Sequence, residues 1–180
     1  MTDDTWRLPP LPVLLVGVAL IACAEVGGGS MVQFKLELAR WARGTMLARP
    51  QVHGLLGVRD VDEQILDEAL LKFDAGLRLF HLHAEGMGTI IIVATMVAST
   101  LARPPALRRA IVLLITLGGA VYPLGYLLWS ALIPFRGVAS GKAVAEWLVW
   151  IPFGSAAIVA MWLLTGALAV RWLRSRRAIA

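Results

Sequence analysis

Long apolar runs separated by short charged segments make up most of this chain. Residues 110–135 and 147–170 contain no charged side chain, and about 18 or more apolar residues in a row are typical of a membrane-spanning helix. The run 86–102 is also free of charge but slightly shorter. At about 1.5 Å per residue it falls short of the ~30 Å hydrocarbon core, so this span is predicted to begin upstream, near residue 80.

The first apolar run, residues 11–24, is too short to cross a bilayer by itself. It spans only if the helix continues through Glu25 and the GGGS of residues 27–30. A carboxylate inside a span usually faces other helices and has a partner there. The pattern therefore predicts four spans, at about 11–34, 80–102, 109–135 and 146–170.

A cleaved leader is the alternative for the N-terminal run. Residues 20–23, LIAC, resemble a lipoprotein cleavage box ending at Cys23, and ACA at 22–24 resembles a signal-peptidase site. The preceding MTDDTWR carries two aspartates and only one arginine, whereas a leader begins with a positively charged region. Retention as a first span is the favoured interpretation.

The segment 35–79 is predicted to be helical and to lie outside the bilayer. Residues 35–49 mix charges with Leu, Trp and Met, which is typical of an amphipathic helix lying on a membrane or on other helices. A loop follows, marked by Pro50, Gly54 and Gly57.

One long helix is predicted after this loop, over about 61–101, with Asp60 or Asp62 as its cap. At 100° per residue its polar side chains form a narrow stripe. The stripe reaches the membrane at His81 and Glu85.

The amino-acid composition also indicates a membrane protein, with the bilayer as its main solvent. Of the 180 residues, 58% are hydrophobic and 16% are charged, with a mean hydropathy of +0.73, whereas soluble domains have about 25% charged residues. The net charge of +5 comes from basic residues gathered at the ends of apolar runs, a pattern of membrane orientation rather than of a nucleic-acid-binding face. A single cysteine excludes an intrachain disulfide.

The arginines predict the orientation. They cluster in the turn 103–109 and the tail 171–177, and positive residues favour the cytoplasm. Both termini are therefore expected inside a bacterial inner membrane, with the segment 35–79 and a loop over 136–146 outside. The sequence predicts an all-α membrane protein forming one integral membrane domain, residues 1–180. Its four transmembrane helices form a bundle, with an external amphipathic helical segment between spans one and two.

The stretch LFHLHAEGMG, residues 79–88, carries the candidate chemistry. His81 and Glu85 are four apart and share one helical face, whereas His83 points to the other side. One helix therefore cannot hold a metal ion between His81 and His83, and a further ligand must come from elsewhere. The alternative is a solvent-exposed helix face without a binding site, on which His81 and Glu85 pair with each other or with Arg78.

The metal hypothesis takes its ligands from histidines and a carboxylate, which bind copper, iron or zinc. Candidate metal ligands are His53, His81, His83 and Glu85, and His83 and His53 are the candidates for binding a cofactor, with copper or haem iron in view. Residues 79–88 alone, with HxH before a glycine-containing span, resemble membrane proteins of the haem-copper and nitric-oxide-reductase type. Glu25 and Glu146 are candidates for orienting the ligands or relaying protons.

Three functions compete. The first is a metal- or haem-binding site in a membrane redox process. The second is an accessory subunit of a larger membrane complex without chemistry of its own, and the third is an enzyme acting on a lipid or quinol, with His81 and Glu85 as its acid–base pair. The bilayer, other membrane subunits and quinone are the expected partners. The sequence lacks phosphate-loop, nucleophile and dinucleotide motifs, which argues against soluble enzyme classes.

A reporter fused after Ala180 tests the orientation. A fluorescent protein that folds only in the cytoplasm is expected to be active there, because the arginine-rich tail at 171–177 favours that side. A periplasm-dependent phosphatase at the same position is expected to be inactive. The opposite pair of activities would reverse the predicted topology.

Overall fold

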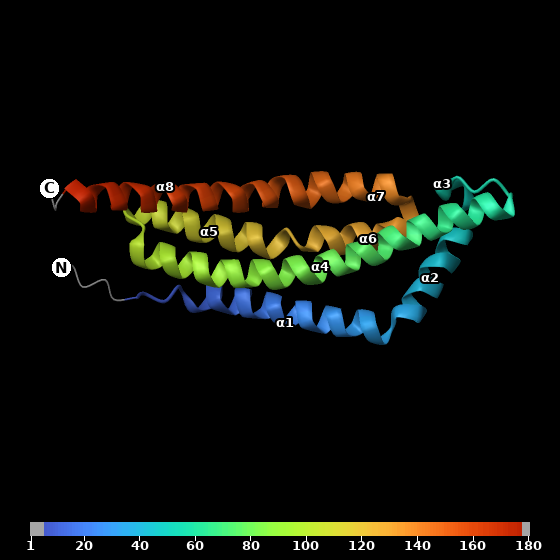
Figure 1. Ribbon diagram of the computed structural model, residues 1–180, viewed down its shortest axis with the longest axis horizontal. Helices are drawn as coiled ribbons and strands as arrows, with labels where there is room; N and C mark the ends of the chain where they lie inside the picture. Colours follow the sequence, from blue (N-terminus) through green and yellow to red (C-terminus); the bar gives the residue numbers. More distant parts are fainter. Residues whose placement is uncertain (1–5, 178–180) are drawn as a thin grey trace.

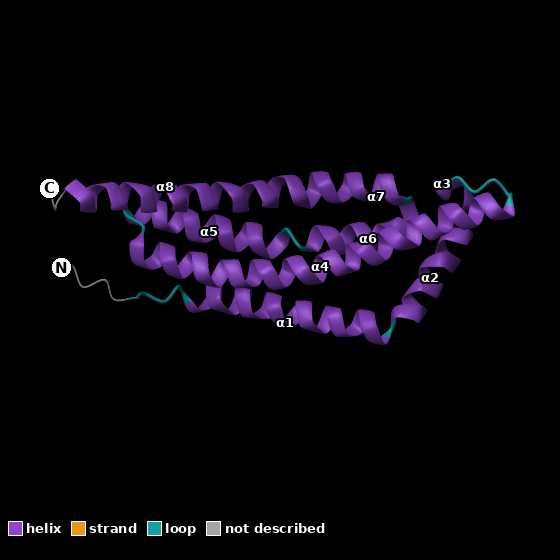
Figure 2. Ribbon diagram, viewed as in Figure 1, coloured by secondary structure: helices purple, strands orange, loops and turns teal. Residues whose placement is uncertain are grey.

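A computed structural model describes residues 6–177 as helices joined by short turns (Figures 1 and 2). The part of the chain so described contains no β-strand. The elements in chain order are α1 (Leu11–Gln33), α2 (Lys35–Leu47), α3 (Pro50–His53), α4 (Arg59–Leu101), α5 (Pro105–Val121), α6 (Leu124–Arg136), α7 (Val138–Ala145), the π-helix η1 (Glu146–Gly154) and α8 (Ser155–Arg177).

Four helical stretches are long and apolar enough to cross a membrane, as the sequence predicted. They cover Leu11–Gln33, Arg59–Leu101, Pro105–Arg136 and Val138–Arg177. Helices suit this solvent because each satisfies its own backbone polar groups, which lipid cannot do.

The long helices lie side by side in the order α1, α4, α5 with α6, and α8 (Figure 1). Helix α1 packs mainly on α4, and α5 packs on both α4 and α8. The beginning of α1, the turn between α4 and α5, and the end of α8 lie at one end of the molecule (Figure 1). The backbone N–H of Arg7 donates to Thr100 Oγ1 at 2.9 Å, which ties the chain before α1 to the last turn of α4.

The prediction of one long helix is confirmed, because α4 runs without a break for 43 residues. The prediction that Asp60 or Asp62 caps this helix is wrong. Val58 precedes the helix and gives no side-chain cap, while the Asp62 carboxylate accepts hydrogen bonds from the backbone N–H groups of Leu56 and Gly57, at 2.7 and 2.9 Å. Asp62 thus holds the preceding loop against the first turn of α4.

The third span is interrupted, which the hydropathy pattern did not indicate. Helix α5 ends at Val121 and α6 begins at Leu124, with Pro123 between them. Proline lacks a backbone N–H and clashes with the preceding turn, so it breaks the helix at this point. The break lies beside the level at which Tyr122 and Tyr126 meet α4.

The prediction of a loop over 136–146 is wrong, because most of this segment is helical. The chain reverses at Gly137 alone, whose φ of +77° suits glycine, and α7 begins at the next residue. Gly141 lets α7 approach α6, since a Cβ there would lie 3.2 Å from Leu132 Cβ. Pattern analysis missed this helix because its polar residues resemble a loop, whereas packing on α6 makes it helical.

The segment between the first two spans packs on other helices. Ala42 and Met46 of α2 are fully buried, in a cluster with Phe73 of α4 and with Trp129 and Ile133 of α6. Trp41 adds a tilted contact to Phe73 and an edge contact to Phe135, with ring centroids 6.2 and 5.9 Å apart. The Arg43 guanidinium pairs with the carboxylate of Glu63. The apolar face of α2 therefore contacts protein side chains.

The contact between α5 and α8 depends on Gly118. A Cβ added at Gly118 would lie 2.6 Å from the carbonyl oxygen of Phe153 and 2.7 Å from the nitrogen of Ala157, both backbone atoms that cannot move aside. At Gly166, farther along α8, the same addition meets nothing within 4 Å. Close approach at a small residue is a common device of membrane helices.

The variant Gly118→Ala is expected to be less stable by about 1–3 kcal/mol, because an overpacked contact forces the helices apart. Gly166→Ala is the matched control and is expected to leave stability unchanged. Denaturation of the purified variants in mixed micelles measures both. Equal stability of the two variants would contradict the close packing of α5 on α8.

Candidate functional site

Three contacts place the sequence-predicted polar residues in one layer across the helices. His81 of α4 meets the backbone of Ala24 in α1, and His83 meets Tyr126 of α6. Tyr126 in turn packs on Trp150 of η1, with ring centroids 4.8 Å apart. The layer lies near residue 80, where the sequence predicts the membrane boundary of the second span.

The imidazole of His81 is fixed against α1. Its Nδ1 lies 2.8 Å from the carbonyl oxygen of Ala24, and because a carbonyl only accepts, Nδ1 carries the proton in the neutral ring. Nε2 then keeps a lone pair and makes no hydrogen bond within residues 6–177. Gly28 makes room for the ring, since a Cβ there would lie 2.9 Å from His81 Cε1.

His81 lines a groove between α1 and α4, with a volume of about 600 Å³. The apolar part of the wall comes from Met31 and Val32. The polar groups of this α1–α4 groove are Glu25, Lys35, Asp74, Arg78 and His81. Asp74 and Arg78 form an ion pair at 2.8 Å, one helical turn apart.

Glu25 lies in the α1–α4 groove beside His81, which is the neighbourhood expected from the sequence. Its carboxylate is exposed and forms no hydrogen bond or ion pair with the described residues. The direct contact predicted for a buried carboxylate is therefore missing. The physical reason is that Glu25 opens onto the groove rather than into the packed helices.

His83 faces the opposite side of α4, as its position in the sequence predicted. The ring stacks on Tyr126 at 4.4 Å between centroids and meets the edge of Tyr122 at 5.6 Å. Its Nδ1 lies 2.8 Å from the Leu79 carbonyl oxygen, so Nδ1 carries the proton and Nε2 accepts. The Tyr126 hydroxyl lies 3.5 Å from that Nε2 and 3.0 Å from the Tyr122 hydroxyl.

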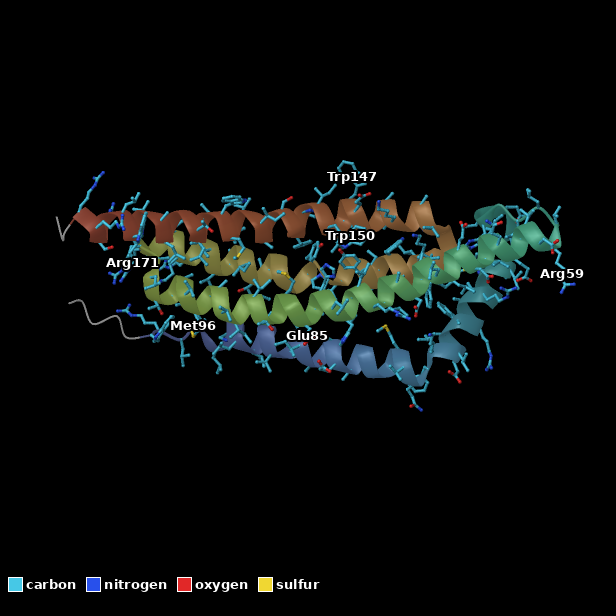
Figure 3. All side chains as sticks on the ribbon, in the orientation of Figure 1. Arg59, Glu85, Met96, Trp147, Trp150 and Arg171 are labelled. Atoms are coloured by element: carbon cyan, nitrogen blue, oxygen red, sulfur yellow. The ribbon has the colours of Figure 1, made fainter. Side chains whose placement is uncertain are left out.

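Trp150 completes this aromatic cluster, which consists of His83, Tyr122, Tyr126, Trp129 and Trp150. The indole points from η1 toward α6, whereas Trp147 of the same π-helix points away from the other helices (Figure 3). Gly125 receives it, because a Cβ there would lie 2.3 Å from Trp150 Nε1. This buried nitrogen has no hydrogen-bond partner in the part of the chain that the structure describes.

His53 lies apart from the other histidines, at the last position of α3. Its Nε2 donates to the carbonyl oxygen of Pro134 at 3.2 Å, near the end of α6. This contact ties the loop between α2 and α4 to the turn before α7. His53 thus serves packing in the structure, and among the described residues its ring contacts neither His81 nor His83.

Glu85 and Glu146 carry no partner in the described chain. Glu85 is exposed on α4, and only its backbone carbonyl accepts a hydrogen bond, from Thr89 at 3.1 Å. Glu146 is half-buried at the start of η1. His81 and Glu85 share a stripe of α4 but do not pair, because the His81 ring turns to the α1 backbone.

The metal hypothesis gains no support from the side-chain positions. Across residues 6–177, no group of three or more His, Cys, Asp or Glu side chains is arranged to hold a metal ion. His81 and His83 each have the Nδ1–H to carbonyl bond that orients metal-bound histidines, but they face different helices. A metal centre would need ligands from outside this part of the chain.

No protein-family model, curated protein or solved structure matches this chain. Arguments about its function therefore rest on the geometry of its own residues.

Sequence reasoning missed several partners in this layer. The Ala24 carbonyl and Gly28 give no chemical signal in a sequence, although the glycines after Glu25 mark a surface that another side chain can approach. Trp150 lies in an apolar run in which the sequence gives no sign of its contact with Tyr126, and this contact forms from the π-helix η1. π-Helical turns are rare and are often found at functional sites.

The hydrogen bonds predict a specific tautomer for each neutral ring. His81 and His83 are expected to carry the proton on Nδ1 and His53 on Nε2, because each of these nitrogens faces a carbonyl oxygen. Nitrogen-15 NMR of histidine-labelled protein, recorded where the rings are neutral, distinguishes the two forms. The variant His81→Gln is expected to remove one of two Nδ1–H signals. Three Nε2–H signals, the usual form in water, would contradict the geometry.

Proposed function

We propose that this protein is a quinone-binding subunit of a membrane redox complex, with the quinol head group bound in the α1–α4 groove. The observation that carries the proposal is the groove itself. It has about 600 Å³, a partly apolar wall, and two lining acceptors, His81 Nε2 and the Glu25 carboxylate, that have no partner among residues 6–177. Small-molecule sites commonly have about 300–1,000 Å³ and combine apolar walls with a few polar groups.

The groups in the groove suit both redox states of a quinone. A quinol hydroxyl donates to Nε2 of His81 or to the Glu25 carboxylate, both of which are free to accept. A quinone carbonyl accepts from Arg78 or Lys35, which line the same groove. Oxidation of one quinol releases two protons and two electrons, and His81 and Glu25 are the bases that take the protons.

The electrons go to a redox centre of a partner subunit, and the chain described here supplies binding and proton transfer. The location of the site near the predicted outer boundary of the second span fits release of protons outside. The proposal keeps both termini in the cytoplasm of a bacterial cell and α2 with α3 outside. Copper or haem iron held by His83 would require displacing Tyr126 from its Nε2 and adding ligands from another chain.

Equilibrium dialysis of the purified protein against a short-chain benzoquinone tests the proposal. Glu25→Gln and His81→Phe are each expected to weaken binding about tenfold, because each loses one hydrogen bond to the head group. Glu85→Gln is the matched control, since Glu85 is exposed on the same helix but does not line the groove.

The design separates quinone binding from general lipid binding. An excess of phosphatidylethanolamine is expected to leave quinone binding unchanged. Two results together would reassign the groove to phospholipid: the lipid competes with the quinone, and neither Glu25→Gln nor His81→Phe weakens quinone binding. Absence of measurable binding to the unmodified protein would overturn the proposed function.

A further inference from the structure

A second cavity opens at the other end of the helices, between the beginning of α1 and α5. It has about 530 Å³ and is almost wholly apolar. Its lining includes Pro10, Ser99, Arg108, Arg109, Leu113 and Leu117. This α1–α5 cavity is separate from the α1–α4 groove and shares no lining residue with it.

The packing of α1 explains why the cavity stays open. Helix α1 packs along α4, and α5 packs on α4 and α8, so α1 and α5 meet only weakly across α4. The small side chain of Ser99 on α4 lies at the base of the gap. Among residues 6–177, no side chain fills the space that remains between the two helices.

The long wall of the cavity is a row of apolar side chains on one face of α5. Leu113 and Leu117 are four residues apart, so they share this face, and they are 59% and 51% exposed. In a bilayer this row lies along the hydrocarbon, and it is the right surface for an acyl chain.

Two arginines close the end of the apolar row. The guanidinium groups of Arg108 and Arg109 make no hydrogen bond or ion pair with any residue from 6 to 177. The sequence offers them few anions: after Glu85, the only acidic residue up to the C-terminus is Glu146, at the opposite end of the span. An anion at this site must therefore come from another molecule or from the residues outside 6–177, which include Asp3 and Asp4.

We propose that the α1–α5 cavity binds one anionic phospholipid. The lipid phosphate lies on Arg108 and Arg109, and one acyl chain follows Leu113 and Leu117 toward the middle of the membrane. Charge complementarity selects this occupant, because two unpaired guanidinium groups next to an apolar cavity match a phosphate joined to a hydrocarbon chain. Basic pockets between membrane helices bind anionic head groups in this way.

Native mass spectrometry of the full chain in mixed micelles tests the site, with phosphatidylglycerol as the probe. The unmodified protein is expected to retain one phosphatidylglycerol, and Arg108→Gln with Arg109→Gln is expected to bind it about thirtyfold more weakly. Arg174→Gln with Arg176→Gln removes the same charge from the end of α8 and is expected to keep the lipid. Equal loss in both double variants would overturn the proposal, because it would indicate nonspecific attraction.

Three further arms identify the ligand. Phosphatidylcholine, which has no net charge, is expected to be retained far less, and inorganic phosphate is expected not to raise the temperature of unfolding as phosphatidylglycerol does. Leu113→Trp fills the cavity without changing its charge and is expected to lose the lipid while keeping the helical circular dichroism spectrum.

Equal effects of inorganic phosphate and phosphatidylglycerol on the temperature of unfolding would overturn the lipid assignment. Lipid binding that appears only in Asp3→Asn with Asp4→Asn would instead assign the arginines to the N-terminal segment.

Discussion

Within hydrocarbon, a backbone N–H or C=O without a partner is costly, and an α-helix avoids this cost by satisfying these groups inside one segment. Helix α4 is the element on which the others depend. It packs against α1, α2, α5, α6 and α8, and at about 1.5 Å per residue its 43 residues exceed the thickness of the hydrocarbon core roughly twofold. Helix α4 is thus one of the four span-forming stretches, and it contacts the other three as well as α2.

The geometry of α4 divides the polar motif between two environments. His81 and His83 are two residues apart, which is about 200° around a helix. His81 therefore contacts the backbone of α1 in an open, charged groove, and His83 lies among tyrosines and a tryptophan between α4, α6 and η1. His81 thus keeps its Nε2 without a hydrogen-bond partner among the described residues, whereas His83 stacks on Tyr126 and is held by a hydrogen bond to the Leu79 carbonyl oxygen.

The marginal position of α1 accounts for both candidate binding sites. Because α1 packs mainly on α4, one gap remains near its beginning and another near its end. Toward Glu25 and Lys35 the gap is polar and suits a small ring with acceptors and donors. Toward Arg108 and Arg109 it is apolar with a basic end and suits a phospholipid. Close approach of Gly17 and Gly88 fixes α1 between these two sites, since a Cβ on either would lie within 2.7 Å of an atom of the opposite helix.

The apolar runs by themselves determined the helical class, the four span-forming stretches and the unbroken helix through His81, because continuous apolar runs of this length are typical of helices that satisfy their own backbone groups in lipid. They also placed His81 and His83 on opposite faces, since that depends only on the helical repeat. Tertiary structure alone decided the rest. Pro123 and Gly137 act through their own backbone chemistry, but the carbonyl acceptors of His53 and His81 and the tyrosines beside His83 depend on which helices become neighbours. That choice is made by close packing at small residues and by backbone carbonyls, neither of which leaves a distinct pattern in the sequence.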